Sequence, residues 1–174
     1  MLTLLTQSAE NAQNMFFLLG GGLLVIIIAV IVSVVASVAG TAAAVTDEDD
    51  VWILGDISWT NPYETRCLIA RLRGKKHWVI GNHDYKLWIN EELRRQFVDI
   101  HEGYHKHIDY SGRTVILSHY PIFMYDGVYR GPVIHLYGHV HNNDHDCKMI
   151  EKWKNEYEEV VGHKVEMHNV GIMV

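Results

Sequence analysis

The sequence predicts an α/β domain preceded by a transmembrane helix, and three features of the chain carry that prediction. Short apolar runs, typical of buried strands, recur from residue 51 onward. Most of these runs end in a glycine or serine followed by a polar residue. Residues 15–45, in contrast, carry no charged side chain. We therefore expect a tail over 1–14, a membrane segment over 15–45 and a folded domain over 46–174.

The apolar segment is long enough to cross a bilayer, which takes roughly 20 apolar residues. A cleaved signal peptide would suit the small residues 42–44, but no basic residue precedes the apolar run and the run is too long. A buried strand is another interpretation, because 24–35 is rich in β-branched residues. An aberrant start or a fusion is also left open. Of these, we favour the transmembrane helix.

Charge distribution bears on location and on partners. All 15 basic residues lie after residue 46, which favours a single-pass protein with its domain on the cytoplasmic side of the membrane. The formal net charge of −6 argues against nucleic acid as an obligate partner, because phosphate backbones bind basic faces. The two cysteines form no Cys-x-x-Cys pair and are expected to be reduced. Nothing in the sequence indicates an oligomeric state.

The predicted elements alternate along the domain. Strands are expected over 51–54, 77–80, 105–110, 113–118, 133–137 and 164–170. Helices are expected over 62–72, 90–97 and 147–160, the first beginning at Pro62, which suits a first helical turn. Loops that leave the strand ends of such folds gather their side chains into one crevice.

Polar residues follow four of these strands, in the strings Gly55-Asp56, Gly81-Asn82-His83-Asp84, Ser118-His119 and Gly138-His139-Val140-His141. Carboxylates, neutral imidazoles and an amide oxygen are suitable ligands for zinc, iron or manganese. Two such ions about 3.5–4 Å apart lower the pKa of a bridging water and hold phosphoryl oxygens. The glycines allow turns that bulkier residues would strain.

In this order, the strings resemble those of the calcineurin-like metallophosphoesterases over about residues 44–174. The resemblance implies a sandwich of mixed β-sheets flanked by helices. It also implies a phosphoesterase that cleaves a phosphomonoester or phosphodiester by metal-activated hydroxide at a centre of two Mn, Fe, Zn or Ni ions. Its implied metal ligands are Asp56, which bridges the ions, His141 at the first ion, and Asn82, His119 and His139 at the second.

The resemblance also implies two catalytic residues outside the metal ligands. His83 would face the phosphate-ester substrate, donating to the phosphate or protonating the leaving alkoxide. Asp84 would orient the His83 imidazole, as carboxylates often do. An ordinary turn cap is the alternative reading of Asp84.

One part of the family pattern is missing. Family members begin with a strand that ends in Asp-x-His and supplies two ligands of the first ion, whereas the first histidine of this chain is His77. The predicted transmembrane helix stands in place of that first strand–helix unit. The first site therefore retains only Asp56 and His141, so one ion per chain is an alternative to two. The rival function is a non-catalytic, membrane-tethered remnant that binds one metal or none.

Overall fold

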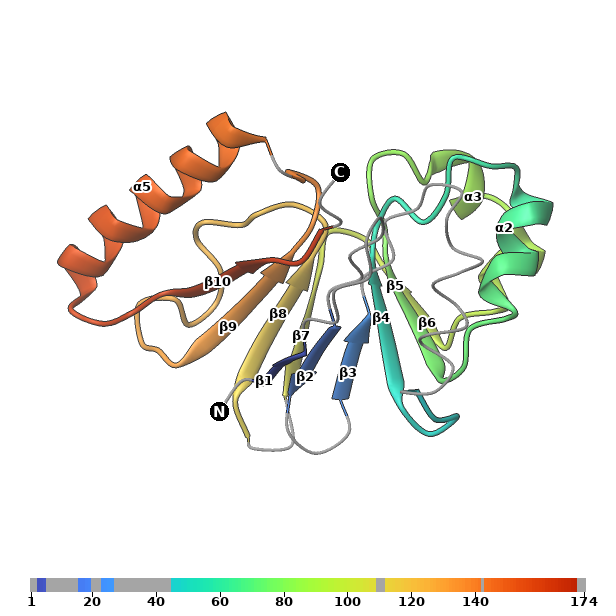
Figure 1. The fold of residues 1–174 in the computed structure, drawn as a ribbon, viewed down its shortest axis with the longest axis horizontal. Coiled ribbons are helices and arrows are strands. Elements are labelled where there is room, and N and C mark those ends of the chain that lie inside the picture. The colour runs from blue at the N-terminus through green and yellow to red at the C-terminus, as the bar shows by residue number, and fades with distance from the viewer. Residues whose placement is uncertain are drawn as a thin grey trace.

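The computed structural model describes residues 45–108, 112–141 and 143–171, together with the strands at 3–5, 16–19 and 23–26. Its core is a sandwich of two β-sheets, with helices on the outer faces of both (Figure 1). The mixed α/β fold with flanking helices, predicted from the sequence, is confirmed.

The first sheet has six strands in the order β1-β2-β3-β4-β5-β6. Strands β3 to β6 run parallel, and β1, β2 and β3 pair antiparallel. Their bounds are β1 Thr3–Leu5, β2 Phe16–Leu19, β3 Leu23–Ile26, β4 Asp50–Leu54, β5 Lys75–Val79 and β6 Asp99–His101. Helices α2 (Pro62–Ile69), α3 (Tyr85–Trp88) and α4 (Glu91–Arg94) are connected to this sheet.

The second sheet has four strands in the order β10-β9-β8-β7. Strands β8, β9 and β10 run parallel, and β7 is antiparallel to β8. Their bounds are β7 Tyr104–Ile108, β8 Thr114–Ser118, β9 Val133–Tyr137 and β10 Glu166–Asn169. Helix α5 (Asp144–Val161) covers the outer face, far from α2 and α3 (Figure 1).

Alternation along the strands explains this layering. Successive side chains of a strand point to opposite faces, so a continuous apolar run buries both of them. Leu117 packs between the two sheets, for example, whereas its neighbour Ile116 packs under α5. Val79 and Trp78 divide in the same way between the central core and the core under α2 and α3.

Most elements lie where the sequence places them, with shifts at their ends. Helix α2 begins at Pro62 as predicted, capped by the Asn61 side chain, but it ends at Ile69. The helix expected over 90–97 is only the single turn α4, and the short helix α3 just before it was not predicted. The sharp turn after α4 brings Phe97 into the core under the helices, which explains the early end.

The segment predicted as a transmembrane helix contains β2 and β3 instead, and its remaining residues up to 44 lie outside the described residues. Leu23 and Leu24 of β3 pair with Asp50 and Val51 of β4. An apolar, β-branched segment suits a sheet as well as a bilayer, and this pairing satisfies the edge of β4. Within the described ranges, no helix combines the length and apolar character that a membrane crossing requires.

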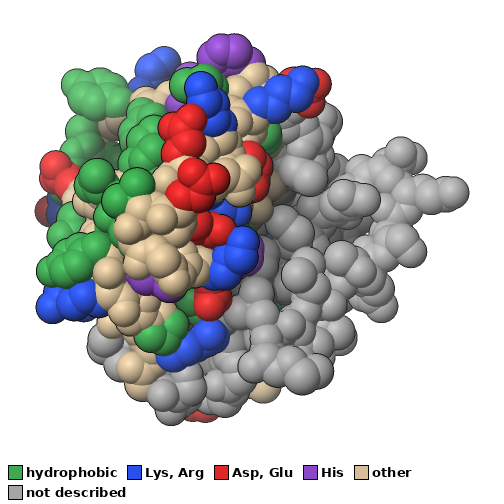
Figure 2. Space-filling view, turned by 90° about the vertical axis from the view of Figure 1, so that its left-hand side faces the viewer, with side chains coloured by type: hydrophobic (Ala, Val, Ile, Leu, Met, Phe, Trp, Pro, Cys, Tyr) green, Lys and Arg blue, Asp and Glu red, His purple; other side chains and the backbone are tan. Residues whose placement is uncertain are grey.

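The solvent face of α5 is strongly charged. Acidic and basic side chains are interspersed over this side of the molecule (Figure 2). Two pairs one helical turn apart, Lys148 with Asp144 and Lys152 with Glu156, have separations of 3.6 and 3.7 Å. Such exposed pairs add little stability, so α5 is held mainly by its buried face, which includes Ile150.

Candidate metal centre

Four predicted ligands follow the carboxyl ends of four parallel strands. Asp56 comes after β4 and Asn82 after β5 in the first sheet, while His119 follows β8 and His139 follows β9 in the second. The His119 imidazole joins the two sheets, because its Nδ1 lies 2.8 Å from the carbonyl oxygen of Leu54. The candidate centre therefore lies where the two sheets meet.

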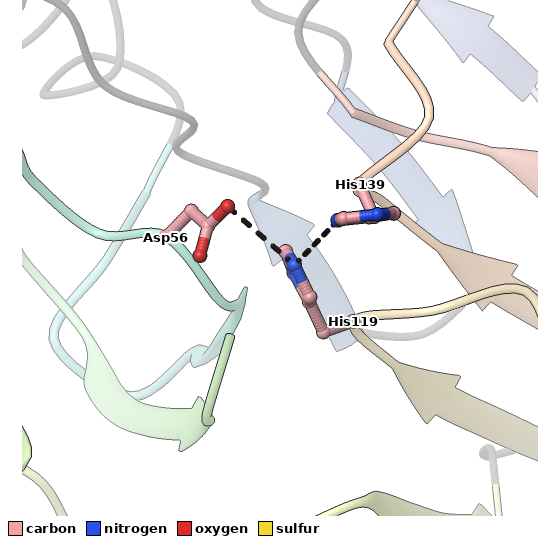
Figure 3. A group of neighbouring side chains, drawn as sticks. All are labelled: Asp56, His119 and His139. Carbon is pink, nitrogen blue, oxygen red and sulfur yellow. Dashed lines mark hydrogen bonds and ion pairs between the residues drawn. The ribbon is translucent and has the colours of Figure 1, made fainter. Parts of the chain in front are cut away.

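His119 is the middle of the ligand group (Figure 3). Its Nε2 lies 2.8 Å from Asn82 Oδ1, 3.1 Å from His139 Nδ1 and 3.5 Å from Asp56 Oδ2. The Leu54 carbonyl accepts a hydrogen bond from Nδ1, so Nδ1 carries the proton. In a neutral imidazole, Nε2 then carries a free lone pair. That lone pair faces oxygen acceptors, and a bound cation would resolve this opposition.

The donor set fits a divalent transition metal. Donor atoms of Asp56, His119 and His139 all lie within 4.8 Å of one another. Asn82 adds an amide oxygen to the two imidazoles and the carboxylate. Nitrogen and oxygen donors of this kind suit Zn, Fe, Mn or Ni, and they do not select among them.

The electrostatics keep His139 available as a ligand. Burial lowers the pKa of His139, and the neighbouring His119 lowers it further, while Asp56 opposes the shift. A lowered pKa means that the imidazole stays neutral to more acidic pH. Metal coordination requires this neutral form.

Backbone strain is concentrated at the predicted ligands. Asp56, His139 and His141 have φ of 51°, 68° and 46°, and they are the non-glycine residues with positive φ within the described part of the chain. Side chains disfavour this left-handed region, and such strain persists where the surrounding structure enforces it, commonly at functional sites. The loops are thus held in conformations that present these three residues.

Two glycines let the ligand loops approach each other. A Cβ on Gly81 would lie 2.3 Å from Asp56 Oδ1, and one on Gly55 would lie 2.4 Å from His119 Nδ1. Neither atom has room to exist without displacing a ligand. Gly138 differs, since the nearest contact of its Cβ would be an ordinary 3.5 Å.

Asp84 is fully buried and binds the loops that carry Asp56 and Asn82. Its carboxylate accepts hydrogen bonds from the backbone N–H groups of Asp56, Ile57 and Gly81 at 2.8–2.9 Å, and from Trp78 Nε1 at 3.1 Å. Burial raises the pKa of this carboxyl, the donors lower it and the charge of Asp56 raises it. These contacts support a role in holding the loops; the predicted orientation of His83 by Asp84 stays a prediction.

His141 is not a member of the compact group that Asp56, His119 and His139 form. Its side chain is exposed. Its backbone carbonyl is held by Asn169 Nδ2 at 2.7 Å. The structure therefore brings Asp56, Asn82, His119 and His139 together and leaves His141 beside them.

The acidic residues 47–50 are engaged in contacts of their own. Asp47 pairs with Arg73 at 3.1 Å, and Asp49 accepts hydrogen bonds from Thr46. Asp50 lies 3.0 Å from His77 Nε2. This turn precedes β4, whereas Asp56 follows it, so these carboxylates belong to the other end of the strand.

Comparison with known proteins decides the family. The family model for calcineurin-like phosphoesterases matches residues 34–168. The chain belongs to the calcineurin-like phosphoesterase family. No curated protein sequence matches it. The crystal structure of AQ665, a protein of unknown function from Aquifex aeolicus, is similar with a TM-score of 0.54 and 21% identity, covering 82% of this chain and 78% of that chain. At that identity the likeness concerns the fold alone.

Two aromatic residues of this chain lie beside the centre and were not predicted as site residues. Trp59, 60% exposed, has its ring centroid 4.0 Å from that of His83. Tyr120 lies 4.8 Å from His119 and 4.4 Å from His139 by the same measure. Their positions three residues after Asp56 and one after His119 were the available signals, since exposed aromatic residues near ligands often contact substrate.

Proposed function

We propose that the chain is a metal-dependent phosphoesterase that hydrolyses a phosphomonoester or phosphodiester. The convergence of Asp56, Asn82 and His139 on the Nε2 of His119 carries this proposal, because it assembles a metal-ligand set from both sheets. Family membership supports the same reaction class.

We further propose that the working centre holds one ion per chain. Residues 1–46 contain one carboxylate, Glu10, and no histidine or cysteine, so the arm offers almost no metal-ligating side chain. Asp56 Oδ1 accepts the backbone N–H of His83 at 2.9 Å, while Oδ2 faces His119. This division supports Asp56 as a ligand of a single ion rather than a bridge between two.

The chemistry divides between the ion and the protein. A bound divalent ion supplies Lewis acidity for the attack of water on phosphorus. His83 lies at the same site, since it follows Asn82 in the chain and its backbone N–H is bound by Asp56 Oδ1. As the bond from phosphorus to the leaving oxygen breaks, His83 donates a proton to that oxygen. Asp84 and the two glycines hold the ligand loops at the separation that coordination requires.

The alternative is a domain that retains the ion without turnover. The observation that favours it is that the compact ligand group of Asp56, His119 and His139 does not include His141, the other predicted ligand of the first ion. In that case the function is sought in binding rather than in hydrolysis.

Metal content and turnover of the full-length chain test the proposal. We expect about one Mn²⁺ per chain and metal-dependent hydrolysis of 4-nitrophenyl phosphate or its bis-ester. Replacement of His119 by Ala should abolish both, because Nε2 of His119 is the shared point of the ligand group. Bound metal without hydrolysis would establish the binding alternative, and two ions per chain would overturn the single-ion centre.

A further inference from the structure

The His83 imidazole lacks the hydrogen bond that usually orients a catalytic histidine. Among the described residues, no hydrogen bond reaches its ring; its backbone N–H is bound by Asp56. The neighbouring carboxylate, Asp84, is occupied by four N–H donors. Because the ring is exposed, a fixed orientation of the imidazole requires some other contact.

That contact is Trp59. The two ring centroids lie 4.0 Å apart, with the planes tilted by 51°. An indole this close excludes many rotamers of the imidazole and adds favourable aromatic contact. Trp59 is also 60% exposed, so burial in the core does not explain its position.

The loop that carries Trp59 is itself firmly held. Before it, Ile57 donates its N–H to Asp84. On either side of it, the hydroxyls of Ser58 and Thr60 lie 2.7 Å apart, and Thr60 Oγ1 lies 3.1 Å from Thr65 Oγ1 in helix α2. Thr65 is fully buried. This hydroxyl chain fixes the backbone around Trp59 to a rigid element.

We propose that Trp59 is a positioning residue that orients His83 for proton donation to the leaving group. The inference rests on the proposed phosphoesterase function. Orientation of a catalytic group contributes strongly to rate, so the loss of one ring contact should be measurable. In this proposal the proton donor His83 is oriented by its contact with Trp59 rather than by a hydrogen bond to Asp84.

Leaving-group dependence tests the role directly. Phenyl phosphate needs protonation of its leaving oxygen more than 4-nitrophenyl phosphate does, and both carry one ring. Trp59→Leu should lower kcat/KM for the phenyl ester by roughly tenfold while changing the nitrophenyl ester little. Trp59→Phe should retain most of the rate, because it keeps an aromatic ring. The same loss on both esters would overturn the proposal.

Two comparisons separate positioning from a general structural effect. In a His83→Ala background, Trp59→Leu should cause no further loss, since the two residues act through one step. The matched control is Tyr63→Leu, which removes another exposed aromatic residue, one in contact with Arg66 rather than His83. An effect of the control equal to that of Trp59→Leu would contradict the proposal.

A spectroscopic measurement on the metal-free protein is independent of turnover. The ring current of Trp59 should displace the NMR signals of the His83 ring protons, and Trp59→Leu should return them toward unperturbed values. Unchanged shifts would overturn the contact. If the wild-type chain hydrolyses neither ester, the proposed function fails, and these shifts alone decide whether Trp59 orients His83.

Discussion

The two sides of the candidate centre are built unequally. On one side, Asp56, Asn82, His119 and His139 converge from the ends of four strands. On the other, His141 lies beside the group, and residues 1–46 contain Glu10 as their one carboxylate. One side has a full ligand set and the other does not.

The difference shows that a sheet position and a metal site have separate requirements. Strand β3 pairs with β4 in parallel and so continues the sheet. Strand pairing needs backbone hydrogen bonds and apolar side chains, which the arm provides. A metal site needs particular side chains, which the arm lacks. The sheet can therefore form with an arm that supplies almost no metal ligands.

The largest expected effect compares two histidines of one motif. His139→Ala removes a member of the compact group, whereas His141→Ala removes a residue beside it. We expect His139→Ala to weaken Mn²⁺ binding by at least about 100-fold, more than loss of an outer partner does, and His141→Ala to weaken it less than tenfold. Calorimetric titration of the metal-free proteins measures both.

Equal losses in the two variants would show that the sides are equivalent and that His141 is a ligand. Both variants change a residue of positive φ, so their backbone effects are matched. Their urea unfolding curves provide the stability control.

Much of this centre was predictable because its information is local. An apolar strand followed by glycine and a polar residue places a ligand at a strand end, and parallel strands bring such ends together. The strand-end positions of Asp56, Asn82, His119 and His139 were predicted in this way, and the resemblance to the family implied their roles as ligands. Strands β4, β5, β8 and β9 were predicted for the same reason, since continuous apolar runs bounded by turns are visible in the sequence. The three-residue strand β6 was not predicted, because DIH contains no such run.

Other features depend on contacts that a pattern does not contain. Apolar composition alone does not separate a membrane helix from the strands β2 and β3; their partner strand does. The role of Asp84 depends on four donors from residues 56, 57, 78 and 81. The Trp59 contact depends on how the loops after β4 and β5 meet.

A smaller effect is expected from Asp84→Asn, which alters the hydrogen bonds that hold the loops of Asp56 and Asn82. An amide cannot accept all four hydrogen bonds, because its NH₂ group faces donors. Removal of the buried charge partly offsets that loss, since burial opposes ionisation. We expect a loss of about 1–3 kcal/mol in unfolding free energy and of about tenfold in Mn²⁺ affinity.

Urea unfolding and metal titration check this prediction, with leaving-group dependence as a third measurement. If Asp84 holds the loops, phenyl and nitrophenyl esters lose rate alike in Asp84→Asn. A selective loss on the phenyl ester would instead restore Asp84 as the residue that orients His83.

The smallest expected effect concerns how the free energy of unfolding depends on pH, through a histidine that contacts the loop after His119. His135 of β9 is fully buried, with Nδ1 3.2 Å from the Ile116 carbonyl, and its Nε2 accepts the N–H of Ile122 in the loop after His119. Burial lowers the pKa of His135 to about 4 from an ordinary 6.5. The unfolded chain therefore binds a proton that the folded chain refuses between those values, and stability falls as pH drops through this window.

We expect His135 to contribute a loss of about 1 kcal/mol in unfolding free energy between pH 7 and pH 5.5 in the metal-free protein. His135→Gln should be less stable at both values but should show a flatter dependence, because glutamine does not titrate. Urea unfolding at the two pH values measures the difference in slope. Parallel slopes would show that His135, which contacts the loop after His119, does not cause the pH dependence. The metal ligands themselves would then be the source of any acid sensitivity at the centre.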